Sequence, residues 1–517
     1  MNRDCNGSDG NAYNTIQEAV NAMNGGDDIY IRGGTYNENV LLPHDGSKDG
    51  TADNYSSIQS YPGEWAIING GHNAAYVLGY TETGSLGAND TAYWRFERLE
   101  ITGGCSGSTS EQCYGIGVNG GPFIVRYCYI HDNYCADSGE SPAGVGGYCW
   151  RDSKIEYNHF YNNGDYGGDN GGDIVIYSDY RPADDDFNSG SYAGYYYARN
   201  EIKYNLFSGG DGSSHGGNIG IRQKGIQDMI DGDYSDMTYK DWGDDIHHNI
   251  FIDYAHSGVQ IWQDFAQVFK NIFDQCPIFV KSYSSGPNKP QAHVVIYNNT
   301  VSGSHIKEYA GGSETSWTVY TYLMNNIVEN FGLDNDHYST SIHFGAHMDG
   351  NASVVTIPSA TTINHNYLYR PQIDDTWLVG GWSNDTYRQT TSEFDSQYSR
   401  SNYQKASSEG TDNLFKGTTG ADKYITRGEH VVSGSTTIAN GGGSSHPYLT
   451  NVDIPTYIGA TNPDDNGWVD GVLNDLSNTD WLKSLTEDRD SNDDPVWIEG
   501  HTSHRSKHYY SGQANFR

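Results

Sequence analysis

Short segments with one arrangement of apolar and polar positions recur along the middle of the chain. Each has an apolar residue, two variable residues, an Asn and then further apolar positions. The copies are IEYNHF (Ile155–Phe160), IKYNLF (Ile202–Phe207), IHHNIF (Ile246–Phe251), VFKNIF (Val268–Phe273), VIYNNTV (Val295–Val301), LMNNIV (Leu323–Val328) and INHNYL (Ile363–Leu368), and VRYCYI (Val125–Ile130) has Cys128 in the Asn place. Asn249 and Asn271 are 22 residues apart, and Asn271 and Asn298 are 27 apart.

A repeat of this length, built from short strands with Asn at a fixed turn, predicts a parallel β-helix. Stacked Asn side chains can hydrogen-bond along the ladder and satisfy backbone groups of the turn. A leucine-rich horseshoe would need regularly spaced Leu, and a β-propeller a longer four-stranded unit. The predicted fold class is therefore all-β.

The first residues predict one helix. TIQEAVNAM (Thr15–Met23) places Ile16, Ala19, Val20 and Met23 on one face at helical spacing. We expect this short amphipathic helix to cap the open end of the β-helix and to hide its edge. DDIYIRGGTYNENVLL and SSIQSYPGEWAIING then provide the first strands.

This opening resembles that of the right-handed parallel β-helix polysaccharide lyases. The segments GGDDIYIRGGTYNENV and SIQSYPGEWAIING carry the resemblance, which is closest to the pectate-lyase and alginate/dermatan-lyase groups and extends through the coils to about residue 370. We expect a right-handed β-helix catalytic domain over residues 1–370. Residues 371–517 lack the Asn repeat, and we expect them to form an irregular C-terminal extension that wraps back on the coils.

The stretch NIGIRQKG (Asn218–Gly225) places Arg222 and Lys224 two residues apart, so both point to one face of a strand. We align the apolar pairs Ile174/Ile176, Ile219/Ile221, Val259/Ile261 and Ile278/Val280 as the inward positions of stacked strands. The outward residues then form two columns, Tyr177, Arg222, Trp262, Lys281 and Asp179, Lys224, Asp264, Tyr283. A third column, at the strand starts, begins with Asp173 and Asn218.

This outward patch suits an anionic sugar chain. Aromatic rings such as Tyr177 and Trp262 can stack on sugar rings, and Arg222 and Lys281 can bind carboxylate or sulfate groups. The ordinary alternative is a surface ladder in which Arg222 and Lys224 neutralise Asp179 and Asp264. His215, His256 and His343 are further candidates, His256 as an acid or base and the other two beside the substrate.

β-Elimination explains why an enzyme would need these residue types. A base must remove the C5 proton of a uronate whose carboxylate is neutralised by a cation. Lys224 can serve as that base if the charge of Arg222 and partial burial lower its pKa, and the resemblance to lyases that use Lys or Arg also favours Lys224. The Lys-Ser…Asn…Arg-His-Gly pattern of the alginate/dermatan group and the Asn-Ser-Asp-Asp-Gly calcium motif of the pectate group are not found.

Calcium is a candidate cofactor, although Asp- and Gly-rich loops are often ordinary turns. The loop GDYGGDNGGDIVIYSD (Gly164–Asp179) offers Asp165, Asp169 and Asp173 as oxygen ligands. Two other functions stay open. A glycoside hydrolase acting on a carrageenan-like polysaccharide would use a carboxylate pair such as Asp179 and Asp264, and a non-catalytic carbohydrate-binding protein would need only the aromatic column.

Composition narrows the partners. The formal net charge of -36 disfavours nucleic acid and anionic membranes, which the field of the protein repels. No apolar run is long enough to span a membrane, and the 42 Tyr and 64 Gly indicate β-structure with many turns rather than disorder. We expect a secreted, monomeric protein whose partner is an anionic polysaccharide.

Overall fold

The computed structural model describes the coils and part of the C-terminal region. The described residues are 12–43, 45–73, 75–79, 93–104, 113–135, 142–148, 150–165, 171–177, 200–209, 219–224, 244–262, 266–283, 294–311, 316–318, 321–329, 342–345, 354–356, 363–364, 366–369, 379–381, 404–405, 460–461 and 467–477.

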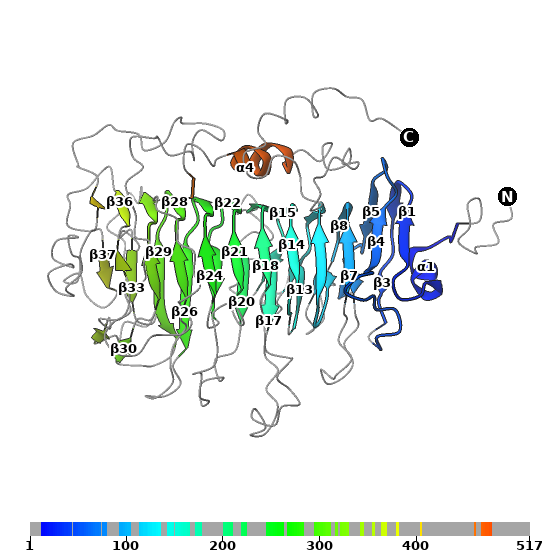
Figure 1. The fold of residues 1–517 in the computed structure, drawn as a ribbon, viewed down its shortest axis with the longest axis horizontal. Helices are drawn as coiled ribbons and strands as arrows, with labels where there is room; N and C mark the ends of the chain where they lie inside the picture. Colours follow the sequence, from blue (N-terminus) through cyan, green and yellow to red (C-terminus); the bar gives the residue numbers. More distant parts are fainter. Residues whose placement is uncertain are drawn as a thin grey trace, which may run out of the picture.

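Three long parallel sheets form the body of the protein (Figure 1). The first sheet contains β1 (Asp28–Ile31), β4 (Ser56–Ser60), β7 (Trp94–Glu97), β10 (Phe123–Arg126), β14 (Lys154–Glu156), β18 (Glu201–Lys203), β21 (Asp245–His247), β24 (Gln267–Phe269), β27 (Val295–Tyr297), β31 (Tyr322–Met324) and β35 (Ile363–Asn364). The second sheet contains β2 (Gly34–Tyr36), β5 (Ala66–Asn69), β8 (Leu99–Thr102), β11 (Tyr129–His131), β15 (His159–Tyr161), β19 (Leu206–Ser208), β22 (Ile250–Ile252), β25 (Ile272–Asp274), β28 (Thr300–Ser302), β32 (Ile327–Glu329), β36 (Tyr367–Tyr369) and β38 (Gln404–Lys405).

The third sheet contains β3 (Val40–Leu41), β6 (Tyr76–Gly79), β9 (Tyr114–Gly117), β13 (Ala143–Tyr148), β17 (Gly172–Tyr177), β20 (Ile219–Lys224), β23 (Ser257–Ile261), β26 (Ile278–Tyr283), β29 (Ile306–Gly311), β33 (Ile342–Gly345) and β37 (Val379–Gly381). Two short pairs, β12 (Tyr134–Cys135) with β16 (Gly164–Asp165) and β30 (Ser316–Thr318) with β34 (Val354–Thr356), lie beside the long sheets. Each coil adds one strand to each long sheet, and the prediction of a right-handed parallel β-helix is confirmed.

The repeated Asn residues form a continuous ladder at the turn between the first and second sheets. In each step the Asn side-chain oxygen accepts hydrogen bonds from the Asn of the preceding coil. The ladder runs through Asn158, Asn205, Asn249, Asn271, Asn299, Asn326 and Asn366. It passes through Asn299 rather than Asn298, because Asn298 is the residue before it and has a positive φ of 52°.

A residue with positive φ also precedes other Asn residues of the ladder. This left-handed conformation explains why the turn needs Asn. Tyr157, Tyr204 and His248 precede their ladder Asn residues with φ values of 57°, 53° and 54°. Such a conformation is unfavourable for bulky residues. The amide side chain that follows supplies donors and acceptors to the turn backbone, as Asn249 does toward the carbonyls of Ile202 and His247.

The N-terminal segment forms the helix α1 (Ile16–Ala22). Thr15 and Glu18 form a capping box at its start, and Ile16 and Val20 are buried in the main core. The helix lies beside the first strands, at the N-terminal end of the stack (Figure 1).

Part of the C-terminal region packs on the coils. The helix α4 (Gly467–Asp470) and the π-helical turn η8 (Gly471–Asp475) bury Trp468 and Val472 against Tyr204 and neighbouring turn residues. Strands β37 and β38 lie beyond residue 370 and extend the third and second sheets. Within the described residues, no helix has the length and apolar character required to cross a bilayer.

Candidate functional site

The outward face of the third sheet carries the residues expected to bind substrate, but in a different register. Ile174 pairs with Ile221, and Tyr177 pairs with Lys224. Arg222 pairs with Gln260 in the next coil. The predicted alignment of Ile174 with Ile219 was therefore wrong by two residues. Only the step from Val259 to Ile278 was correct.

Two features of β20 explain this error. A Cβ atom on Gly220 would meet the ring of Phe251 in the core, so Gly220 and Ile221 both face inward and the strict alternation breaks before Ile221. The second inward position of the strand is Gln223, which pairs with Ile261 and is fully buried. Its amide donates to Asp244 (2.6 Å), so a polar residue occupies a position where an apolar one was expected.

Arg222 and Trp262 form the centre of the predicted patch. The Cζ atom of Arg222 lies 4.5 Å from the centroid of the Trp262 ring, and only 2% of Arg222 is exposed. They do not share a row, since Trp262 directly follows β23 and Arg222 pairs with Gln260. Stacking on an aromatic face holds the guanidinium plane in one orientation.

A second group of ionisable side chains surrounds Phe279, two coils further along. The Phe279 ring centroid lies 5.1 Å from that of His256 and 5.8 Å from that of His305. The Nζ atom of Lys307 lies 5.3 Å from the same ring. Phe279 pairs with both Gln260 and Lys307, so Arg222, Gln260, Phe279 and Lys307 form one row across β20, β23, β26 and β29. We call this the cationic row.

Burial changes the titration of the two basic residues next to Phe279. Only 3% of Lys307 is exposed, and burial lowers its pKa to about 8. Burial, and then the charge of Lys307, lower the pKa of His305 to about 3. Near neutral pH His305 is therefore uncharged, and Lys307 loses its proton only slightly above neutrality. A lysine with this pKa is suited to remove a proton.

The sequence analysis missed Lys307, His305, Gln260 and Phe279. The segment HIKEY (His305–Tyr309) does contain a signal, because Ile306 alternates with Lys307 in the same way as Ile221 with Arg222. Ile306 pairs with Ile278, but the next inward position is Glu308, opposite Val280. The apolar pair used to align the other coils is absent there.

Other predicted site residues are located only by their strand positions. Lys224 lies opposite Tyr177, Lys281 opposite Tyr309, and His343 opposite Lys307. Asp165 lies in β16, opposite Cys135. Asp179, Asp264, His215 and Asp169 lie outside the described residues.

Asp173 does not occupy the outward position expected of a calcium ligand. It is fully buried. Its Oδ1 accepts a hydrogen bond from Asn163 (2.7 Å), and its Oδ2 accepts one from the Tyr254 hydroxyl. Because both oxygens are already engaged inside the coil, Asp173 does not fit a calcium site on the sheet surface. No group of three or more His, Cys, Asp or Glu residues in the described part of the chain is arranged to hold a metal ion.

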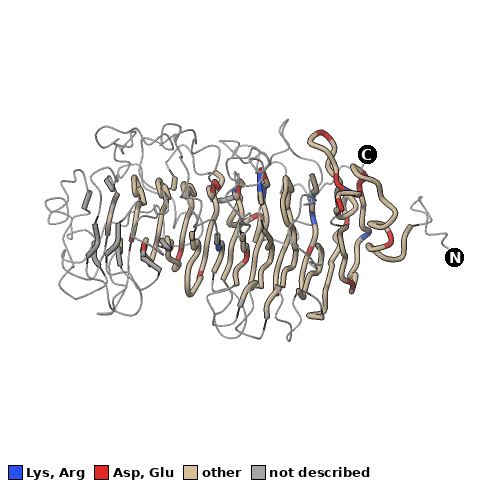
Figure 2. The backbone as a smooth tube through the Cα atoms, turned by 90° about the horizontal axis from the view of Figure 1, so that it is seen from below, with Lys and Arg blue, Asp and Glu red and all other residues tan. Residues whose placement is uncertain are grey.

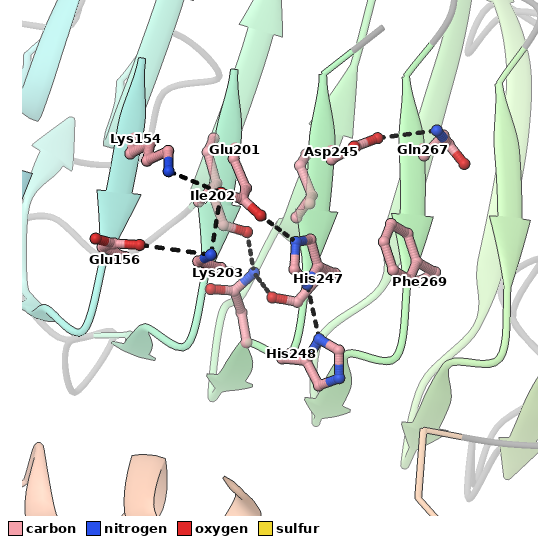
Figure 3. A network of polar contacts seen from close by, with 12 residues as sticks. Lys154, Glu156, Glu201, Ile202, Lys203, Asp245, His247, His248, Gln267 and Phe269 are labelled. Atoms are coloured by element: carbon pink, nitrogen blue, oxygen red, sulfur yellow. Dashed lines mark hydrogen bonds and ion pairs between the residues drawn. The ribbon is translucent and has the colours of Figure 1, made fainter. Parts of the chain in front are cut away.

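A second polar network lies on the first sheet (Figure 3). Lys203 lies 3.0 Å from Glu201 and 3.6 Å from Glu156, and His247 Nε2 lies 3.2 Å from Glu201. Burial acts to raise the pKa of Glu201, but His247 and Lys203 outweigh it and hold the pKa at about 2. The charges of this network compensate one another, which leaves little attraction for a polyanion.

Charge also differs along the coils. Figure 2 shows several acidic positions close together on the N-terminal coils. The segments that form the first coils contain Asp27, Asp28, Glu38 and Glu64. Arg32 pairs with Glu64 and Arg95 with Asp28, which leaves a net acidic surface that does not attract an anionic chain. The cationic row, which contains two cations, an amide and an aromatic ring, is the better place for it.

Comparisons with known proteins give structural likenesses only. No family model and no curated protein matches the chain. The complex of XylC with xylose is 12% identical, with a TM-score of 0.41, and the match covers 71% of this chain and 84% of that one. The PL6 family alginate lyase AlyGC is 13% identical (TM-score 0.37, 72% and 55% covered), and the pectate lyase Pel9A is 14% identical (TM-score 0.35, 68% and 74% covered). The fold assignment itself rests on the three sheets of this chain.

Proposed function

We propose that this protein is a secreted polysaccharide lyase that cleaves a uronate-containing polysaccharide by β-elimination. The observation that carries the proposal is the cationic row, in which an arginine stacked on tryptophan and a buried lysine lie on one face of a rigid sheet. Arg222 would bind a carboxylate of the substrate through its planar guanidinium. Lys307 would act as the base.

The chemistry at Lys307 is a proton abstraction. The neutral amine takes the C5 proton of a uronate, the C4–O bond breaks, and a C4–C5 double bond forms. The proton needed by the departing glycosidic oxygen comes from a neighbouring acid or from water. The carboxylate must be neutralised by a cation for C5 to become acidic. Lys281 and His343 occupy positions one strand away from Lys307, where a cation would serve this purpose.

Arg222 and Lys307 act on different sugars in this proposal. Their strands are three steps apart in the sheet, which is about 14 Å at ~4.8 Å per step. Arg222 would therefore anchor a neighbouring uronate while Lys307 reacts. The arrangement with Lys224 as the base places Arg222 beside the reacting sugar instead, on the same strand.

Variants of the two lysines distinguish these arrangements. Purified Lys307→Met, Lys224→Met and wild-type protein are incubated with pectate, alginate and dermatan, and the ultraviolet absorbance of unsaturated uronate is followed. Lys154→Met is a matched control, because the Lys154 side chain is 50% exposed and lies on the first sheet. We expect loss of absorbance in Lys307→Met only.

Two results would contradict the proposal. Activity retained in Lys307→Met but lost in Lys224→Met would move the base to Lys224. Growth of reducing ends without ultraviolet absorbance, measured also on carrageenan, would indicate hydrolysis instead of elimination.

A further inference from the structure

Tyrosines gather on the third sheet next to the cationic row. Tyr114 and Tyr177 are buried in a cluster separate from the main core, and Tyr76 and Tyr148 are partly buried against them. The ring centroids of Tyr148 and Tyr177 lie 5.3 Å apart in a stacked arrangement, and those of Tyr76 and Tyr114 lie 5.6 Å apart. Each partly exposed ring is therefore held by a buried one. We call these four residues the tyrosine platform.

Two glycines let these rings lie close to the sheet. A Cβ atom on Gly117 would lie 2.3 Å from Cδ1 of Tyr76, and one on Gly146 would lie 2.3 Å from Cε1 of Tyr114. Any other residue at these positions would push the ring away from the backbone. The rings consequently cover the strands, and a ring held in this way offers its face to a ligand at low entropic cost.

The platform lies next to the cationic row. Tyr148 pairs with Tyr177, and Tyr177 pairs with Lys224. In the adjacent row Val175 pairs with Arg222. β13 and β17 contribute Ala143, Gly146 and Val175 around the rings, without a charged side chain among them. Over its described residues, the third sheet thus changes along its length from an uncharged aromatic surface to a cationic one.

We propose that the tyrosine platform binds pyranose rings of the same polysaccharide chain, remote from the bond that is cleaved. This inference rests on the proposed function, because it assigns the platform to the substrate of the cationic row. Tyr76 and Tyr148 contact the sugar faces, and Tyr114 and Tyr177 support them. A chain bound from Tyr148 to Lys307 crosses five strand-to-strand steps, which is about 24 Å. The protein therefore favours long chains over short oligosaccharides.

The test compares substrates of different length. Wild type, Tyr148→Ala and Tyr148→Phe are assayed on the uronate polymer that responds and on its trisaccharide. We expect Tyr148→Ala to lower the ratio of kcat/KM on polymer to kcat/KM on trisaccharide about tenfold, the equivalent of one aromatic stacking contact. Tyr148→Phe, which keeps the ring, retains most of the ratio. Tyr30→Ala is the control, because Tyr30 is 48% exposed on the first sheet.

A binding measurement separates this inference from the proposed function. The dissociation constants of wild type and Tyr148→Ala for alginate and pectate are measured by affinity electrophoresis, which needs no turnover. If no elimination occurs but Tyr148→Ala still weakens polymer binding about tenfold relative to Tyr30→Ala, the platform stands and the lyase proposal fails. If elimination occurs and the length ratio is the same in wild type, Tyr148→Ala and Tyr76→Ala, the platform is overturned. Failure of the wild type to bind either polymer also overturns it.

Gly117→Ala gives a second, independent perturbation. The added methyl displaces the Tyr76 ring without removing it, so the length ratio should fall in the same direction as in Tyr76→Ala. Melting temperatures of all variants show whether the coils remain folded. A ratio that is unchanged in a folded Gly117→Ala protein would remove Tyr76 from the platform.

Discussion

The guanidinium of Arg222 lies over the ring of Trp262, with 4.5 Å between Cζ and the ring centroid. The two residues come from neighbouring coils, since Arg222 belongs to β20 and Trp262 follows β23. The backbone of Trp262 is also fixed, because its N–H donates to the carbonyl of Gln223 at 2.8 Å. A planar cation held between two coils is suited to a planar anion such as a carboxylate.

Replacing Arg222 tests this relationship. Arg222→Lys keeps the charge but loses the planar fork and its stacking on Trp262. We expect KM for the uronate polymer to rise about tenfold, with a smaller change in kcat. Trp262→Phe, which retains an aromatic face, should give an intermediate KM. Equal KM values for Arg222→Lys and wild type in steady-state kinetics would show that the guanidinium geometry is not used.

The pKa of Lys307 predicts how the rate of the reaction depends on pH. A base must be neutral to accept a proton, so kcat/KM should rise with pH and level off above the Lys307 pKa of about 8. Phe279→Ser would admit water next to the amine and return its pKa toward the ordinary value near 10.4. The rising limb should then move to higher pH. A profile that does not move in a folded Phe279→Ser variant would argue against Lys307 as the base.

The sequence predicts the coils well because each coil repeats a local rule. The ladder positions of Asn158, Asn205, Asn249 and Asn271 were recognised from the repeated segment, and the helical spacing of the apolar residues in Thr15–Met23 predicted α1. Such signals come from residues that are neighbours in the sequence or lie at a fixed turn. They need no knowledge of the register between distant strands.

The candidate site depends on that register. Polar residues at inward positions of the third sheet made the register unrecognisable from the sequence. Gln223 and Glu308 occupy inward positions opposite Ile176 and Val280. Gln223 is tolerated there because Asp244, more than twenty residues away, accepts its hydrogen bond. Asp173 was interpreted as a surface calcium ligand because its buried partner could not be identified from the sequence. That partner, Tyr254, is 81 residues away and belongs to another coil.

Asp173 should make stability depend on pH. Burial raises its pKa to about 7, against the hydrogen bonds from Tyr254 and Asn163, which act to lower it. A carboxyl whose pKa is raised on folding favours the folded state below its unfolded pKa of about 3.9. This contribution is lost as pH rises toward 7.

Asp173→Asn should therefore stabilise the protein relative to wild type at pH 8 by about 4 kcal/mol more than at pH 4. The introduced amide can still accept from Asn163 and donate to the Tyr254 oxygen. Denaturant unfolding at the two pH values measures the difference, with the exposed residue Asp53 changed to Asn as control. The same stability difference at both pH values would show that Asp173 does not titrate in this range.

The Asn ladder gives the sharpest test of what holds the coils together. The Oδ1 of Asn249 accepts from the backbone N–H and the side chain of Asn205, at 2.9 and 3.0 Å. Its Nδ2 donates to the carbonyls of Ile202 and His247 and to Asn271. Asn249→Ala removes all of these at once and leaves buried partners unsatisfied. We expect a loss of about 3 kcal/mol in the free energy of unfolding.

Asn249→Asp distinguishes the contribution of the side-chain oxygen, which accepts hydrogen bonds, from that of the side-chain amide, which donates them. It keeps the oxygen that Asn205 needs, but at neutral pH it turns a carboxylate toward the carbonyls of Ile202 and His247. The loss of stability should therefore exceed that of Asn249→Ala at pH 7 and become smaller at pH 4, where the carboxyl is protonated and can donate once. Asn73→Ala, at an exposed position, is the control. If Asn249→Asp were as stable as wild type at pH 7, donation by the ladder amides would contribute little, and the left-handed residue His248 would have to be stabilised by other contacts.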